Sequence, residues 1–219
     1  MPTLLIQLYG PMQSWRLGPR LERRPTQPLP TKSGVVGLLA AALGRPRGSR
    51  IEDLAALRMG VRVDRPGVLE TDYQVVRNVI QAKGRGLKNA QTWRGYLADA
   101  AFLVGLEGER RLLEELARAL KTPQFVPYLG QKGFLPAAPL YRGLRLQLGL
   151  EEALASEPII VRAREAEEVD VYVEDPEGEL LLPDAPEEAL AEIGMPRALG
   201  VRAVRRYRIT AHPAEEEPA

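Results

Sequence analysis

The sequence predicts an α+β fold of the ferredoxin-like (RRM-like) type, with one antiparallel sheet and helices on one of its faces. Over residues 1–148, the patterns run strand, helix, strand, excursion, strand, helix, strand. Hydrophobic residues make up 45% of the 219 residues, which is enough for a sizeable core. RNA-recognition modules share this plan with small enzymes, so the fold class alone does not decide function.

The first strand is expected over residues 3–9, where a mostly apolar run ends at a glycine and a proline. The first helix is expected over residues 35–43. Thr31 or Ser33 is placed to cap its start, and Gly44 to end it in the left-handed conformation.

Two further strands and a short helix follow. The helix is expected over residues 51–57 and a strand over residues 59–64. A turn at 66–67 then leads into a returning strand over residues 68–76. Residues 77–95 are polar, basic and contain glycine, and they are predicted to form an extended excursion.

The next strand is predicted over residues 96–107. An amphipathic helix follows over residues 109–120, with its leucines on one side. Residues 123–139 are expected to form an irregular loop, and residues 140–148 another strand.

From residue 149 the chain becomes acidic, so we divide it into a larger part, 1–148, and a smaller part, 149–219. The smaller part is expected to be rich in short strands and to end in a frayed tail. Its strand-like pieces are residues 158–163, 169–174, 179–182 and 201–210, with a hairpin turn at 175–178.

Charge is distributed unevenly along the chain. Residues 10–50 hold eight basic residues against one acidic residue, and residues 77–94 hold five basic residues and no acidic one. Residues 151–192 hold fifteen acidic residues against two arginines. Basic segments attract phosphates and acidic segments repel them, although a charge run is also the ordinary composition of a solvated face.

Several classes of function are excluded by what the sequence lacks. It has no cysteine, and its one histidine, His212, lies in the C-terminal tail, so no metal site or histidine-based catalysis is expected. Neither a dinucleotide-binding nor a phosphate-loop glycine motif occurs, so no cofactor is expected. We see no signal peptide and no membrane-spanning run, which favours the cytoplasm.

The proline-rich loop at 10–32 and the helix start that follows it carry the first group of candidate RNA ligands. A helix N-terminus with a lysine suits a phosphate, and an exposed tryptophan suits base stacking. The alternative is that the tryptophan plugs the loop onto the core and the hydroxyls only cap the helix. The candidates are Gln13, Ser14, Trp15, Arg24, Thr31, Lys32 and Ser33.

The basic excursion and its neighbours carry the second group. Cations beside an aromatic side chain suit binding of single-stranded RNA, whereas the alternatives are a solvated hairpin tip and a turn that serves only the fold. The candidates are Tyr73, Arg77, Lys83, Arg85, Lys88, Trp93, Arg94 and, in the 123–139 loop, Lys132.

An ordered set of motifs over residues 3–140 resembles the CasD subunits of type I-E CRISPR Cascade complexes, in the RAMP superfamily. The motifs are GPMQSW (10–15), RPT (24–26), PTKSGVVGLLAAALG (30–44), DYQVV (72–76), QTWRGYLADAAF (91–102) and PYLGQK (127–132). The last third of the chain matches this family poorly.

The resemblance implies a ferredoxin-like body with a protruding basic thumb at about residues 77–95. It also implies binding of the 5′ handle of a guide RNA, with backbone RAMP subunits and a large subunit as partners in antiviral defence. Members of this type are not the nuclease, and Gln74 stands where the family often has histidine.

Three functions therefore remain for comparison. The first is a non-catalytic, RNA-binding subunit without a cofactor. The second is a metal-independent endoribonuclease that processes CRISPR precursor RNA, with tyrosine and lysine as general acid and base. The third is a ferredoxin-like enzyme or regulator of a small molecule, which would need an apolar pocket with convergent polar groups.

Overall fold

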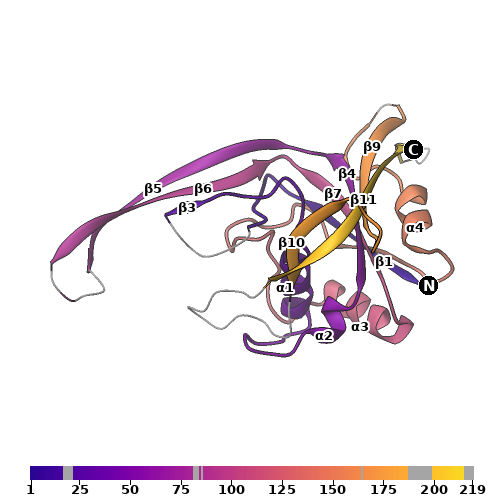
Figure 1. Cartoon of the computed structure of the whole chain (residues 1–219), viewed down its shortest axis with the longest axis horizontal. Helices are drawn as coiled ribbons and strands as arrows, with labels where there is room; N and C mark the ends of the chain where they lie inside the picture. Colours follow the sequence, from indigo (N-terminus) through magenta and orange to yellow (C-terminus); the bar gives the residue numbers. More distant parts are fainter. Residues whose placement is uncertain (17–21, 81–83, 85, 164, 187–198, 215–219) are drawn as a thin grey trace.

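The computed structural model describes residues 1–16, 22–80, 84, 86–163, 165–186 and 199–214. They form a mixed α+β protein, as predicted, with two sheets and a few helices (Figure 1). The strands are β1 (Thr3–Tyr9), β2 (Met12–Gln13), β3 (Arg23–Arg24), β4 (Arg58–Arg65), β5 (Val68–Ile80), β6 (Leu87–Ala98), β7 (Ala101–Glu107), β8 (Tyr141–Arg145), β9 (Glu167–Glu174), β10 (Leu180–Pro186) and β11 (Leu199–Ala211). The helices are α1 (Lys32–Ala42), α2 (Glu52–Ala55), α3 (Arg110–Lys121) and α4 (Leu150–Ser156).

The larger sheet has seven strands in the order β10-β11-β9-β4-β7-β1-β8. Its neighbouring strands pair antiparallel throughout. Four of them, in the order β4-β7-β1-β8, come from the part of the chain before residue 148, and the other three come from the acidic part. The boundary expected at residue 148 therefore lies between elements of one hydrogen-bonded sheet, where β4 pairs with β9.

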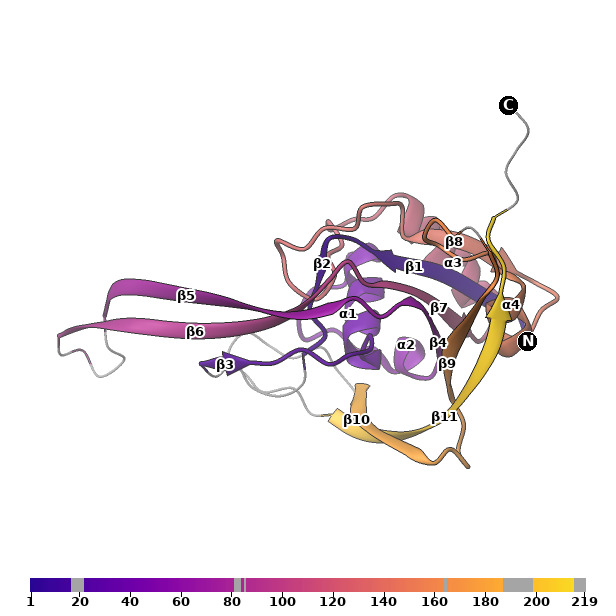
Figure 2. The same ribbon diagram turned by 90° about the horizontal axis from the view of Figure 1, so that it is seen from above.

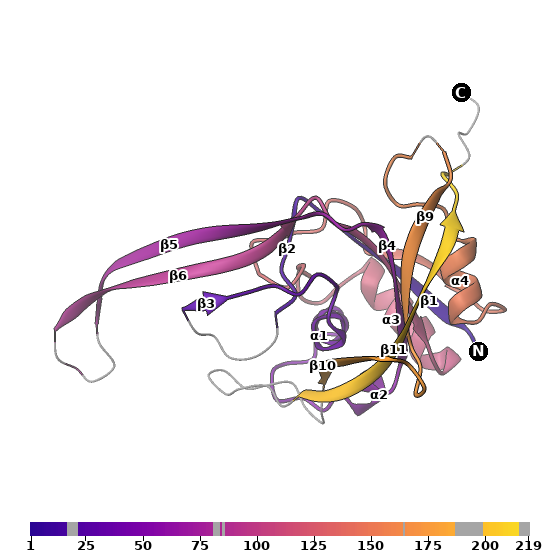
Figure 3. The same cartoon turned by 45° about the horizontal axis from the view of Figure 1, so that its top comes forward.

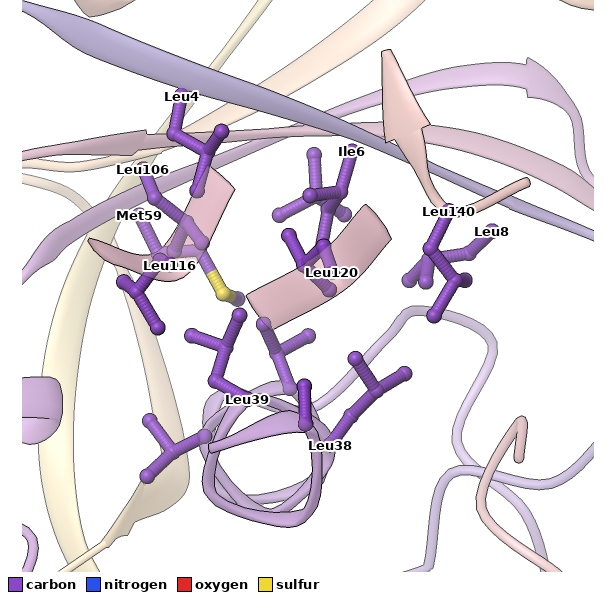
Figure 4. Close-up of a cluster of buried hydrophobic side chains, with 14 of the residues drawn as sticks. Leu4, Ile6, Leu8, Leu38, Leu39, Met59, Leu106, Leu116, Leu120 and Leu140 are labelled. Atoms are coloured by element: carbon purple, nitrogen blue, oxygen red, sulfur yellow. The ribbon is translucent and has the colours of Figure 1, made fainter. Parts of the chain in front are cut away.

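Helices α1 and α3 cover one face of this sheet. Leu4, Ile6 and Leu8 alternate along β1 and point into the main core, as expected for a strand with a period of two (Figure 4). Leu38 and Leu39 of α1 and the leucines of α3 meet them there. The amphipathic pattern of residues 109–120 is thus confirmed as a helix that buries its apolar side.

The opposite face carries α4, a helix of the acidic part that was not predicted from the sequence. Leu5 and Leu103 point to this side and pack with Leu150 and Leu154 of α4. The helix approaches closely because β7 has a glycine below it: a Cβ at Gly105 would lie 2.6 Å from the Leu150 Cδ1 atom. This helix was missed from the sequence because seven residues are too few to show a clear helical periodicity. Its acidic residues also made the segment resemble the rest of the acidic part.

The second sheet is dominated by a long antiparallel hairpin, β5-β6, which extends away from the body in all three views (Figures 1, 2 and 3). The returning strand at 68–76 was expected to pair with the strand before it, but β5 pairs with β6 instead. The strand predicted at 96–107 is also divided, because Asp99 takes a positive φ of 54° between β6 and β7. Much of the predicted excursion is therefore regular strand.

The acidic part adds β9, β10 and β11. Both β9 and β10 run antiparallel to β11, so the turn at 175–178 does not join a hairpin. Residues 158–163, expected as a strand, form none; instead the carbonyl oxygen of Pro158 accepts a hydrogen bond from the buried Arg62 at 2.9 Å. The described part of the chain contains no helix that is long and apolar enough to cross a bilayer.

Candidate nucleic-acid interface

The loop after β1 is held against the root of the hairpin by Gln13. Its amide nitrogen donates to the carbonyl oxygens of Leu8 and Ala100, at 2.9 and 2.8 Å, and its amide oxygen accepts from Trp15 Nε1 at 3.1 Å. The residue is fully buried. Its polar atoms are therefore used inside the protein rather than on a surface.

Ser14 joins three segments that are far apart in the sequence. Its Oγ donates to the Gly95 carbonyl oxygen at 2.9 Å, and its amide donates to the Leu129 carbonyl oxygen at 3.0 Å. Gly130 crosses so close to Ser14 that a Cβ on it would lie 1.7 Å from the Ser14 carbonyl oxygen. With its φ of 84°, Gly130 is thus required for the packing of the 123–139 loop.

Trp15 is 1% exposed and belongs to the main core. Its amide donates to Thr26 Oγ1 at 2.8 Å, and its ring lies over Gly34, where a Cβ would be 2.9 Å from Trp15 Cε3. Trp15 therefore plugs the loop onto the core rather than offering an exposed ring for base stacking. Its ring fastens the proline-rich loop to the start of α1.

The start of α1 is buried and faces the chain's own carboxylates. Thr31 caps the helix by accepting a hydrogen bond from the Gly34 amide at 3.2 Å. The backbone amide of Lys32 donates to Asp184 Oδ2 at 2.9 Å, and Lys32 Nζ lies 2.9 Å from Glu174 Oε1. Ser33 is also buried. Asp184 thus occupies the position at the helix N-terminus that was expected to suit a phosphate.

Two carboxylates of the acidic part form ion pairs that join elements of the larger sheet and its helix. Glu151 binds Arg58 at 2.6 Å, and the hydrogen bond from Arg58 holds the pKa of the Glu151 carboxyl below its usual range. Asp170 binds Arg206 at 2.9 Å, and this hydrogen bond likewise lowers the pKa of Asp170. The first pair fastens α4 to β4, and the second joins β9 to β11.

One exposed part of the interface is a row of three side chains across the second sheet, here called the aromatic row: Arg23, Trp93 and Tyr73. Trp93 of β6 pairs in register with Tyr73 of β5 and Arg23 of β3. The Trp93 and Tyr73 ring centroids are 5.2 Å apart, and the Arg23 guanidinium carbon lies 5.5 Å from the Trp93 ring centroid. Tyr73 is 51% exposed, so the row offers an accessible surface for stacking.

Two other candidates, Arg24 and Arg94, directly follow Arg23 and Trp93 in the sequence and are register partners on β3 and β6. Arg77, Lys88 and Lys132 are exposed, the first two on the outer half of the hairpin and the third in the 123–139 loop. Lys83 and Arg85 lie outside the described residues. The structure therefore separates the candidates into a buried group, at the loop after β1 and the start of α1, and a group that is exposed or half-buried, on the second sheet and at Lys132.

Arg23 was not singled out from the sequence, although it completes the aromatic row. Thr26 was also missed, and it accepts the hydrogen bond that orients the Trp15 backbone. The Arg-Arg-Pro-Thr run at 23–26 contributed basic charge and a family motif, but it did not indicate which side chains it contacts. The register of β3 on β6, which brings Arg23 beside Trp93, joins segments about 70 residues apart and has no local pattern.

These features define a class of protein: a mixed α+β body that projects a long hairpin with arginines and aromatic side chains at its root. The family model described as CRISPR-associated protein (Cas_Cas5) matches residues 3–208. The CRISPR system Cascade subunit CasD of Escherichia coli (strain K12) is 36% identical over 156 residues, covering 64% of this chain and 70% of that protein.

Two solved structures agree. One, described as a Cas protein, has a TM-score of 0.77 and 44% identity, covering 96% of this chain and 97% of its own. The other, from a CRISPR RNA-guided surveillance complex, has a TM-score of 0.81 and 30% identity, covering 98% and 95%. The chain belongs to the CRISPR-associated Cas5 family and is a CasD-type member of it. The family model extends through residue 208, so the match includes most of the last third, which was expected to match poorly.

Proposed function

We propose that this protein is a non-catalytic, RNA-binding subunit of a Cascade surveillance complex in antiviral defence. It holds the 5′ handle of the guide RNA and caps one end of the backbone of RAMP subunits. The observation that carries this proposal is the aromatic row, where Trp93 lies between a half-exposed tyrosine and a guanidinium on a projecting hairpin. Such a row stacks unpaired bases and attracts the phosphates between them.

The proposal includes a structural assignment. The strand order β4-β7-β1-β8, with α1 and α3 on one face, supports a ferredoxin-like unit at the centre of the larger sheet. The β5-β6 hairpin, with Arg77 and Lys88 exposed towards its outer end, supports the thumb expected at about residues 77–95. The large subunit of the complex and the backbone subunits are the proposed protein partners, in the cytoplasm.

The buried candidates have a different part in this proposal. Gln13, Ser14 and Trp15 make internal hydrogen bonds at the root of the hairpin. We assign them to orienting the loop and the hairpin, so that Arg23 reaches Trp93. RNA contacts are assigned to exposed side chains, among them Tyr73, Lys88 and Lys132.

The test is binding of the full chain to a labelled RNA that carries the 5′ handle of the host's CRISPR repeat, with an unrelated RNA of equal length as control. We expect handle-selective binding that weakens with salt. A second arm incubates unprocessed repeat RNA with the protein in EDTA. Site-specific cleavage that is lost on Tyr73→Phe would contradict the proposal and establish the metal-independent endoribonuclease instead.

A further inference from the structure

The two faces of the hairpin differ in chemistry. On one face lies the aromatic row. On the other, here called the polar face, β5 presents Asp72 and Gln74, and β6 presents Arg94 and Thr92 as their register partners. Partners in an antiparallel pair, and residues two apart in a strand, share a face, so these four side chains lie together.

Two atoms on the polar face are buried and have no hydrogen-bond partner among the described residues: Thr92 Oγ1 and Arg94 Nε. A buried polar atom left unpaired costs about 1–3 kcal/mol, and more for a charged group. For either atom, no hydrogen bond among the described residues offsets this cost. A ligand that hydrogen-bonds both atoms would recover this cost.

The charged side chains on the polar face favour an anionic ligand. Arg24 on β3 is the register partner of Arg94, and Asp72 on β5 lies on the other side, so this line of the sheet holds two guanidiniums and one carboxylate. The carboxylate already accepts a hydrogen bond from the Gln74 amide. An anion that accepts from Arg94 Nε would pair this donor through a charge-assisted hydrogen bond.

The Thr92 hydroxyl sets a second requirement for the ligand. Thr92 and Arg94 are two residues apart on β6, or about 7 Å along the strand. A ligand must therefore offer an anion beside a group that pairs with a hydroxyl, which either donates or accepts. A ribose-phosphate strand has this combination, because each ribose carries a 2′-hydroxyl next to a phosphate.

We propose that the polar face is a subsite for the sugar-phosphate backbone of RNA, in which Thr92 Oγ1 bonds a ribose 2′-hydroxyl and Arg94 Nε donates to a neighbouring phosphate. This inference rests on the proposed function and adds a second contact surface to the aromatic row. RNA then contacts the hairpin on both faces, through its bases on one and its backbone on the other. The Thr92 contact makes the site selective for RNA over DNA.

The first test replaces Thr92 with valine, which keeps the shape and removes the hydroxyl. Affinity for the handle RNA should fall about two- to tenfold, the effect of one hydrogen bond. Affinity for the same strand made of 2′-deoxynucleotides should not change. Thr210→Val, the same change at an exposed position on β11 of the larger sheet, is the control and should leave both affinities unaltered.

A structural role makes the opposite prediction for stability. If Thr92 Oγ1 has an internal partner, Thr92→Val lowers the unfolding midpoint; if it is unpaired, the midpoint stays or rises. A lower midpoint with unchanged RNA affinity would overturn the inference. So would a loss of binding to a partner subunit while RNA affinity stays at the wild-type value, because the polar face would then be a protein contact.

Arg94 is tested by two substitutions. Arg94→Lys keeps the charge but removes the Nε donor, so affinity should fall while the salt dependence stays the same. Arg94→Gln should also make the slope of log K against log salt shallower by about 0.7, as for one phosphate contact of a single strand. If both variants bind like the wild type, the inference is wrong and the proposed function stands. If the wild type itself does not bind the handle RNA, both are wrong.

Discussion

Lys32 at the start of α1 and Glu174 at the end of β9 form an ion pair, with Nζ 2.9 Å from Oε1. Arg202 of β11 approaches the same carboxylate at 3.4 Å and binds Asp184 at 2.6 Å. The four charges are mostly buried and join the first helix to the last strands of the chain. The acidic part is therefore fastened to the basic helix start rather than left as a separate surface.

We predict that Lys32→Ala lowers the free energy of unfolding by about 3 kcal/mol, because it leaves Glu174 with one charged partner fewer in a buried site. Urea unfolding measures this. Lys88→Ala is the control: this exposed lysine should leave stability unchanged and weaken RNA binding. If Lys32→Ala instead kept its stability and lost RNA affinity, Lys32 would contact RNA and its ion pair with Glu174 would contribute little to stability.

The two tryptophans should separate folding from binding. Trp15→Ala removes a fully buried ring and should cost about 3–5 kcal/mol of stability. Trp93→Ala should reduce RNA affinity by about 1–3 kcal/mol, the contribution of a stacked base, with a smaller effect on the unfolding midpoint. Trp15→Phe retains a ring. If this variant kept its stability but lost RNA binding, Trp15 would contact RNA directly, against the prediction.

Arg62 should be the most sensitive charged position for stability. It is fully buried, binds Asp64 at 2.7 Å, and donates to the Leu154 carbonyl oxygen at 2.6 Å, so it holds the end of α4 on β4. Arg62→Met should cost about 3–5 kcal/mol, because it leaves the Asp64 carboxylate buried and without its partner. The double change Arg62→Met with Asp64→Leu should recover part of this loss; no recovery would mean that packing, not charge, sets the cost.

The basic run from Lys83 to Lys88 should set the salt dependence of RNA binding. Changing Lys83, Arg85 and Lys88 together to alanine should weaken binding and make the salt slope shallower, by about 0.7 for each phosphate that these side chains neutralise. Titration at several salt concentrations measures the slope. Unchanged affinity and slope would remove these three residues from the proposed RNA surface.

Stability should decrease on acidification in a way that depends on Glu151. Its folded-state pKa lies below the unfolded value because Arg58 donates to it. The stabilisation is therefore complete above the unfolded pKa, about 4.3, and is lost as the pH falls through the folded pKa. Glu151→Gln should be less stable than the wild type at pH 7, and the difference should shrink towards about pH 3. A pH-independent difference would exclude this linkage.

The sequence predicted the elements whose signal is local. β1, α1 and α3 were found from apolar periodicity and capping residues, because a helix or strand that buries one side must repeat its apolar residues with the period of its backbone. Trp15 shows the limit of such patterns. From the sequence, Trp15 could either plug the loop onto the core or offer a stacking surface to RNA. The packing of its ring over Gly34 shows that it is the plug.

By itself, the sequence determined the α+β class, the uneven distribution of charge and the family, since composition, period and ordered motifs are properties of the chain alone. Only the tertiary structure decided which charges remain exposed. Lys32 is covered by Glu174 and Asp184, from more than 140 residues away, whereas Arg23 meets Trp93 at the surface. Pairings of this kind depend on strand register and on long-range packing, and no local pattern carries that information.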